Sequence, residues 1–169
     1  MAMMHTKLQA GFTLLIAMIF MSLMLSFGLA LSSLAYKQEV LSSSAIESQY
    51  AFYAADAALE CALYADQQKN LFAYASSNSA PAPVLTCDGA APVSATVLSR
   101  TAGRWVIGTR LSFDSNKRCA DVTVYKPAGN GETYLFSEGY DVPCLTVASP
   151  GNARFTIRGV QSHYSSFAP

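Results

Sequence analysis

Hydrophobic residues are spread very unevenly along this 169-residue chain. Residues 12–36 carry no charge, and this stretch of about 25 residues exceeds the ~20 that a helix needs to cross a membrane. We predict a retained transmembrane helix here. A buried helix of a soluble protein is one alternative, but such helices rarely stay uncharged for so long. A signal peptide cut after Ala35, with Ser33 at the minus-three position, is another, although its apolar region would be unusually long.

The helical pattern continues beyond the apolar segment. Residues 37–75 contain neither proline nor glycine and are rich in alanine, leucine and glutamine, which favours a helix. Apolar residues recur there at helical spacing, and we expect this amphipathic half of the helix to pack on the domain through them. The expected stripe consists of Ile46, Tyr50, Tyr53, Ala57, Cys61, Tyr64 and Leu71, widened by Phe52, Leu59 and Leu63.

The C-terminal half has a different period. Residues 76–92 are rich in Ser, Ala and Pro and are predicted to form a loop. Alternation with period two then predicts a β domain over residues 93–169. Its expected strands are 93–100, 104–113, 119–126, 133–140 and 153–164. Because no helix separates the strands, we predict an α+β fold in which the long helix covers a small antiparallel sheet of about four or five strands.

All 4 cysteines follow the apolar segment, which points to an oxidising compartment. Four cysteines allow three connectivities. A hairpin that pairs Lys126 with Thr133 places Cys119 opposite Tyr140, within reach of Cys144. We favour the disulfides Cys61–Cys87 and Cys119–Cys144, with the other connectivities left open.

Charge and motifs indicate neither an enzyme nor a nucleic-acid-binding protein. Basic and acidic residues number 11 each. Because the chain has no excess of basic residues, nucleic acid is not an expected partner. His163 is the one histidine outside the first eleven residues, and no hydrolase, phosphate-loop or zinc motif is present. Residues 114–116 and 129–132 lack the spacing of a calcium loop and are expected to be turns. We therefore expect no cofactor and no metal.

The junction before the apolar segment is specific. A short polar leader that contains Lys7 ends at Gly11, and Phe12 opens the apolar run at once. This junction resembles the leader of type IV pilins and pseudopilins. The resemblance implies that residues 1–11 are a leader, that prepilin peptidase cuts between Gly11 and Phe12, and that Phe12 is then N-methylated. It further implies a single-pass inner-membrane protein with a cytoplasmic N-terminus, whose outer domain later joins an extracellular pilus.

Two further features narrow the resemblance. Most pilins have glutamate at the fifth mature position, where this chain has Ile16. A carboxylate within the membrane needs a partner. The absence of this glutamate is typical of PilX-type minor pilins and of the tip-located K-type pseudopilin of type II secretion. The run from Gln49 to Ala62 also resembles PilX-type proteins. Together, the two features of the resemblance imply subunit contacts through Ile16, Phe52, Asp56 and Glu60.

Asp56 and Glu60 lie four residues apart and share a helix face. This face is either simply solvated or pairs with a basic residue of another subunit. The resemblance implies a subunit that takes part in pilus assembly or priming. Its partners would be prepilin peptidase, major and other minor pilins, the inner-membrane platform and, before assembly, membrane lipid. The alternatives are the K-type pseudopilin and a tip module that binds surfaces or DNA.

Overall fold

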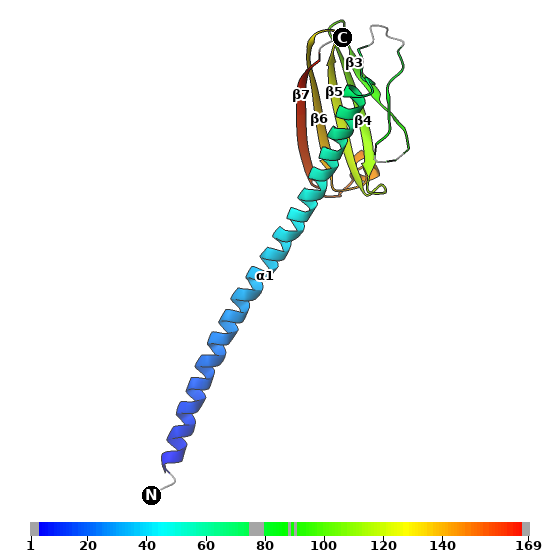
Figure 1. Ribbon diagram of the computed structural model, residues 1–169. Coiled ribbons are helices and arrows are strands. Elements are labelled where there is room, and N and C mark those ends of the chain that lie inside the picture. Colours follow the sequence, from blue (N-terminus) through cyan, green and yellow to red (C-terminus); the bar gives the residue numbers. More distant parts are fainter. Residues whose placement is uncertain (1–3, 75–79, 88, 90, 167–169) are drawn as a thin grey trace. The chain divides into compact units, whose positions relative to one another are not determined.

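The structure is a computed structural model that describes residues 4–74, 80–87, 89 and 91–166, with the backbone alone for residues 4–10 and 166. The chain divides into two compact units, Met1–Ser44 and Ala45–Pro169. A single helix, α1 (Met4–Gln67), supplies the first unit and continues into the second (Figure 1). The long N-terminal helix expected from the sequence is therefore present.

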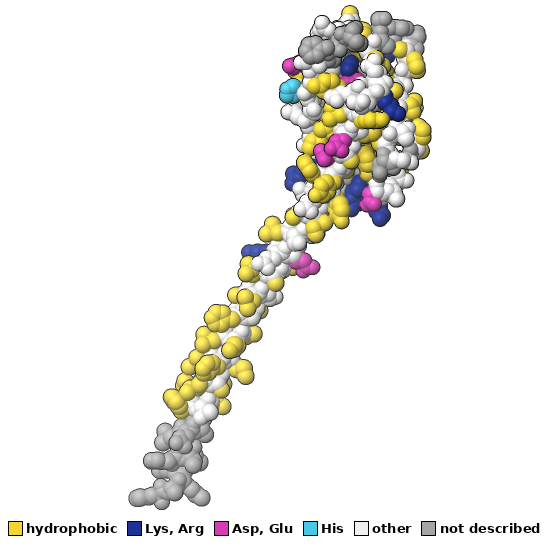
Figure 2. Space-filling view, in the orientation of Figure 1, with side chains coloured by type: hydrophobic (Ala, Val, Ile, Leu, Met, Phe, Trp, Pro, Cys, Tyr) yellow, Lys and Arg dark blue, Asp and Glu magenta, His cyan; other side chains and the backbone are white. Residues whose placement is uncertain are grey.

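Within the first unit, residues 12–36 of α1 carry no charge and place hydrophobic side chains on all sides of the helix. Hydrophobic side chains follow one another along this segment (Figure 2), and every residue from 11 to 44 is exposed. Among the described residues, one helix is long and apolar enough to cross a membrane, namely α1 from Gly11. Such a helix requires an apolar environment around its whole circumference.

The second unit contains the antiparallel sheet. Its five strands lie in chain order and all neighbours are antiparallel (Figure 1). Cys119 pairs with Tyr140, so the expected hairpin register is confirmed. The fold is thus α+β with a pilin-like architecture, as expected. The strands are β3 (Thr96–Arg100), β4 (Arg104–Phe113), β5 (Arg118–Pro127), β6 (Gly131–Tyr140) and β7 (Ile157–Ser166).

Helix α1 ends earlier than expected, at Gln67 instead of residue 75. Asn70 adopts a left-handed conformation, with φ +50°, and reverses the chain. Its N–H donates to the carbonyl of Asp66, and the N–H of Leu71 donates to that of Ala65. Asparagine tolerates this conformation better than most residues, so it can close a helix in the place of glycine.

Two short elements, β1 (Val84–Leu85) and α2 (Cys144–Ala148), were missed, and the expected strand 93–100 is divided after residue 94. β1 lies within the expected loop and pairs with β2 (Val93–Ser94) in a separate two-stranded sheet. The one-turn helix α2 follows β6. Elements of two to five residues show no readable periodicity. The last strand begins at Ile157, not at residue 153, because its ladder starts opposite Tyr140, where β6 ends.

The face of α1 that packs on the sheet is made of alanines, not of the expected large residues. Of the expected stripe, Tyr50, Tyr53 and Tyr64 are exposed, and the main buried contribution is Leu59. The reason is the short distance between helix and sheet. A Cβ added at Gly139 of β6 would lie 2.1 Å from the carbonyl oxygen of Ala51. The buried alanines of α1 are Ala51, Ala54, Ala55, Ala58, Ala62 and Ala65.

We expect the Gly139→Ala substitution to lower the free energy of unfolding by about 3 kcal/mol, because the added methyl group forces the helix away from the sheet. The control is Gly129→Ala, at a position where an added Cβ meets nothing within 4 Å. It should leave stability almost unchanged. Urea unfolding of the detergent-solubilised chain measures both. Equal stability of the two variants would contradict the close approach of α1 and β6.

Candidate functional site

The expected processing junction lies on the exposed part of α1. Phe12 is 66% exposed, and an added Cβ at Gly11 would meet nothing within 4 Å. Ile16 is 37% exposed, one turn further along the helix. Within the described residues, nothing covers the peptide bond between Gly11 and Phe12. The junction is thus sterically accessible, and the apolar side chains of Phe12, Leu14 and Leu15 that follow it are exposed.

The outward face of α1 in the second unit carries aromatic residues. Tyr53 is 64% exposed and Phe52 is 44% exposed, and their rings meet edge to face at 6.0 Å between centroids. Tyr50, about one helical turn before Tyr53, is also exposed. We call Tyr50, Phe52 and Tyr53 the aromatic patch. Contiguous exposed apolar surface of this kind marks interaction sites.

The two acidic residues of the same segment differ in their surroundings. Asp56 is half-buried and Glu60 is exposed. Neither side chain forms an ion pair or a hydrogen bond with another described residue. Glu60 lines a groove in the second unit, whereas Asp56 does not. Asp56 and Glu60 therefore have different surroundings, because only Glu60 lines the groove.

The groove has a volume of about 640 Å³. One wall is α1, and the other comes from the turn between β4 and β5 and from the first disulfide. Its lining combines aromatic rings, small side chains, two carboxylates and one guanidinium. The lining residues are Tyr50, Tyr53, Ala54, Ala57, Glu60, Cys61, Cys87, Phe113, Asp114 and Arg118. The groove is a tertiary feature that the sequence analysis did not anticipate.

Both disulfides have the pairing that we favoured from the sequence. Cys61–Cys87 joins α1 to the segment between β1 and β2, with a Cα–Cα distance of 5.9 Å. Cys119–Cys144 joins β5 to α2, at 4.8 Å. Each closes a loop of about 25 residues, which stabilises the fold by ~3 kcal/mol in the chain-entropy model.

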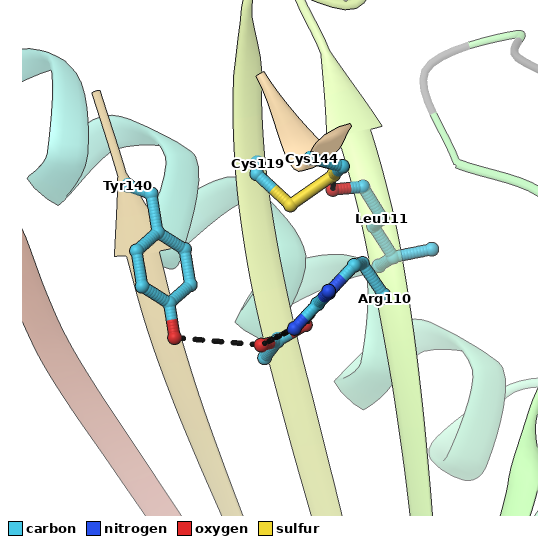
Figure 3. The surroundings of a disulfide bond; sticks show 6 residues. Arg110, Leu111, Cys119, Tyr140 and Cys144 are labelled. Atoms are coloured by element: carbon cyan, nitrogen blue, oxygen red, sulfur yellow. Dashed lines mark hydrogen bonds and ion pairs between the residues drawn. A yellow bond between two sulfur atoms is a disulfide. The ribbon is translucent and has the colours of Figure 1, made fainter. Parts of the chain in front are cut away.

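A charged cluster lies beside the second disulfide (Figure 3). Arg110 donates two hydrogen bonds of 2.7 Å to Asp121, and Tyr140 donates to Asp121 at 3.4 Å and to Glu138 at 3.3 Å. Desolvation, followed by the charges of Asp121 and Glu138, raises the pKa of Tyr140 to about 12. The hydrogen bonds to Asp121 raise the pKa of Arg110. These contacts brace β4, β5 and β6 against one another.

A second polar cluster holds the end of α1 to the sheet. Asp66 is 3% exposed, and its Oδ2 accepts from the Nζ of Lys126 at 2.6 Å and from the hydroxyl of Tyr164. Burial, with the hydrogen bond to Asp66 as the next cause, raises the pKa of Tyr164. The three residues come from α1, β5 and β7. We call Asp66, Lys126 and Tyr164 the tie, because their contacts hold these three elements together. None of the three residues lines the groove.

No group of three or more His, Cys, Asp or Glu side chains in the described part of the chain could hold a metal ion. His163 lies on β7 and its ring stacks on Tyr134, with centroids 5.8 Å apart. Comparison with protein-family models, with curated proteins and with solved structures gives no match for this chain. The functional argument therefore depends on the residues themselves.

The buried ion pair predicts an asymmetric mutational effect. Lys126→Met leaves the carboxylate of Asp66 buried and unpaired, and should lower the free energy of unfolding by about 3–5 kcal/mol. Combining it with Asp66→Asn removes that charge, so the double variant should be more stable than Lys126→Met alone. Urea unfolding measures the cycle. A double variant that is less stable than the single one would contradict the tie.

The pKa of Tyr140 predicts a loss of stability in alkali. The unfolded tyrosine ionises near pH 10, whereas the folded one stays neutral up to about pH 12. The unfolded chain therefore loses its proton first, and the free energy of unfolding falls as the pH rises between these values. Tyr140→Phe should make this fall shallower, with the remainder due to Tyr164 and Tyr134, whose pKa values are also raised. Parallel pH profiles of wild type and variant, measured by urea unfolding, would contradict this.

Proposed function

We propose that this chain is a PilX-like minor pilin, a structural subunit of a type IV pilus that takes part in pilus assembly or priming. The observation that carries the proposal is the junction itself. Gly11 and Phe12 stand between a polar leader and a helix that is apolar on every side and exposed in the structure. The pilin-like α+β fold supports the proposal.

The helix explains how such a subunit would function. Before assembly, the side chains of residues 12–36 would be covered by lipid, in a single-pass inner-membrane protein. After prepilin peptidase removes residues 1–11, major and other minor pilins would replace the lipid around the same helix. The exchange of one apolar environment for another costs little free energy, because no charged residue in this segment needs a new partner. The inner-membrane platform would direct the subunit into the filament.

Ile16 favours a minor position over a major one. Without a carboxylate at this position, the subunit cannot neutralise the ammonium group of an adjacent mature N-terminus. The same observation supports a second candidate, the K-type pseudopilin at the tip of a type II secretion filament. The two candidates share leader removal and helix packing, and differ in the filament that receives the subunit.

A substitution at the junction tests the proposal. Gly11→Val should block leader removal, because a bulky residue before the bond hinders entry into the peptidase, while the structure has room for the added side chain. The variant should remain in the membrane with its 11 leader residues and be absent from sheared surface fibres. Immunoblots of membranes and fibres measure this.

The matched control is Gln9→Val, which introduces the same valine within the leader but away from the bond. It should be processed and should enter fibres as the wild type does. Recovery of the uncleaved Gly11→Val chain in fibres would contradict the proposal. So would the absence of the wild-type chain from every pilus and secretion filament.

A further inference from the structure

The groove beside Glu60 is a preformed site that the proposed function leaves unused. It lies wholly within the second unit, and one of its walls is fixed by the disulfide Cys61–Cys87. Its volume of about 640 Å³ is in the range of pockets that hold a side chain or a small ligand. Since the disulfide and α1 hold its sides, the groove needs no rearrangement to receive an occupant.

The charges in the groove favour a cation. The side chains of Glu60 and Asp114 have no ion pair or hydrogen bond with another described residue. Arg118 is the one cation among the lining residues, and contacts within the chain hold its guanidinium in place, although its buried Nε has no hydrogen-bond partner in the described part of the chain. Its guanidinium lies 4.2 Å from the centroid of the Tyr50 ring and donates to the carbonyl of Lys117 at 3.0 Å. The lining therefore offers one net negative charge and two unpaired carboxylates.

The uncharged lining suits a cation carried on an apolar stem. Tyr53 and Phe113 supply rings whose faces attract ammonium and guanidinium groups. The lining also includes the exposed Ala57, whose small side chain allows another backbone to approach α1 closely. The stems of lysine and arginine pack on apolar surface while their charged heads reach polar groups. An acidic occupant would be repelled, and a neutral one would leave both carboxylates without a partner.

We propose that this groove binds a lysine or arginine side chain of a neighbouring filament subunit, with Glu60 and Asp114 as the charge partners. The inference rests on the proposed function, since it takes the neighbour to be a pilin. Tyr50 and Tyr53 belong both to the groove and to the aromatic patch, so a segment that packs on the patch brings its side chains to the groove. The contact would select which subunit occupies this side of α1.

The first test measures cation binding by the full chain in detergent micelles. N-acetyl-arginine amide and N-acetyl-lysine amide are titrated, and the resonances of Tyr53 and Phe113 are followed by NMR. Saturable binding in the millimolar range is expected for both probes. The neutral N-acetyl-norleucine amide, which has an apolar stem but no charge, should bind about tenfold more weakly. Equal binding of the neutral and cationic probes, or no saturable shift at these residues, would overturn the proposal.

Substitutions locate the charge partners. The double variant Glu60→Gln/Asp114→Asn should bind the cationic probes about tenfold more weakly than the wild type. Both positions are exposed, and Asn tolerates the left-handed conformation of residue 114, with φ +51°, so the fold should be kept. Glu47→Gln, at an exposed acidic residue of α1 outside the groove, should bind as the wild type does. A double variant with wild-type affinity would overturn the assignment.

The second test identifies the source of the cation. In cells, the double variant should lose its leader normally, yet its recovery in sheared fibres should fall by about threefold or more. Normal recovery would show that the cation does not come from a filament subunit and would overturn the proposal, even if the probes bind. Failure of leader removal in the wild type would instead count against the proposed function, so the two failures are distinguishable.

Discussion

The structure of the second unit depends on the close approach of α1 to β6. Gly139 lies against the backbone of α1 at Ala51 and Ala55, where an added methyl group would clash with main-chain atoms. Where the helix approaches Gly139 only alanines fit between helix and sheet, and apart from Leu59 the large side chains of this segment point elsewhere. The aromatic patch and the wall of the groove thus follow from a packing constraint on the opposite face of the helix.

This constraint links the fold to the proposed function. A helix buried through alanines keeps its large side chains for contacts outside its own domain, and Phe52 and Tyr53 are placed in that way. The first unit has an equivalent need along residues 12–36, where the apolar side chains have no partner within the described chain. Lipid before assembly and other subunits afterwards would cover the apolar side chains of residues 12–36 and the exposed rings of Phe52 and Tyr53. Within the proposal, one helix therefore carries the membrane anchor and the assembly surface.

The sequence predicted the elements that have strong local signals. The apolar segment, the alternation in Arg104–Phe113 and the hairpin register at Cys119 and Tyr140 were all read correctly. The packing face of α1 was read wrongly, because hydrophobic spacing favours large residues and cannot report how closely a glycine on a distant strand lets the helix approach. The end of α1 was also misplaced, since the left-handed conformation of Asn70 leaves no periodic signal.

For the candidate site too, local sequence signals predicted only part of what the tertiary structure shows. Glu60 was found through its spacing from Asp56, but its neighbours in the groove lie far along the chain, with Asp114 in the turn after β4 and Arg118 at the start of β5. The tie between Asp66 and Lys126 likewise joins residues 60 positions apart. Isolated charges in alternating strands have many possible partners, so tertiary structure is needed to choose among them.

The most direct test of the account is the N-terminus of the mature protein isolated from the cells that make it. Tandem mass spectrometry of the N-terminal peptide should find that the chain begins at Phe12 and that its amino group is methylated. A chain that begins at Tyr36 would establish secretory cleavage, and one that keeps residues 1–11 would show that no leader is removed. Either of these results would contradict the account.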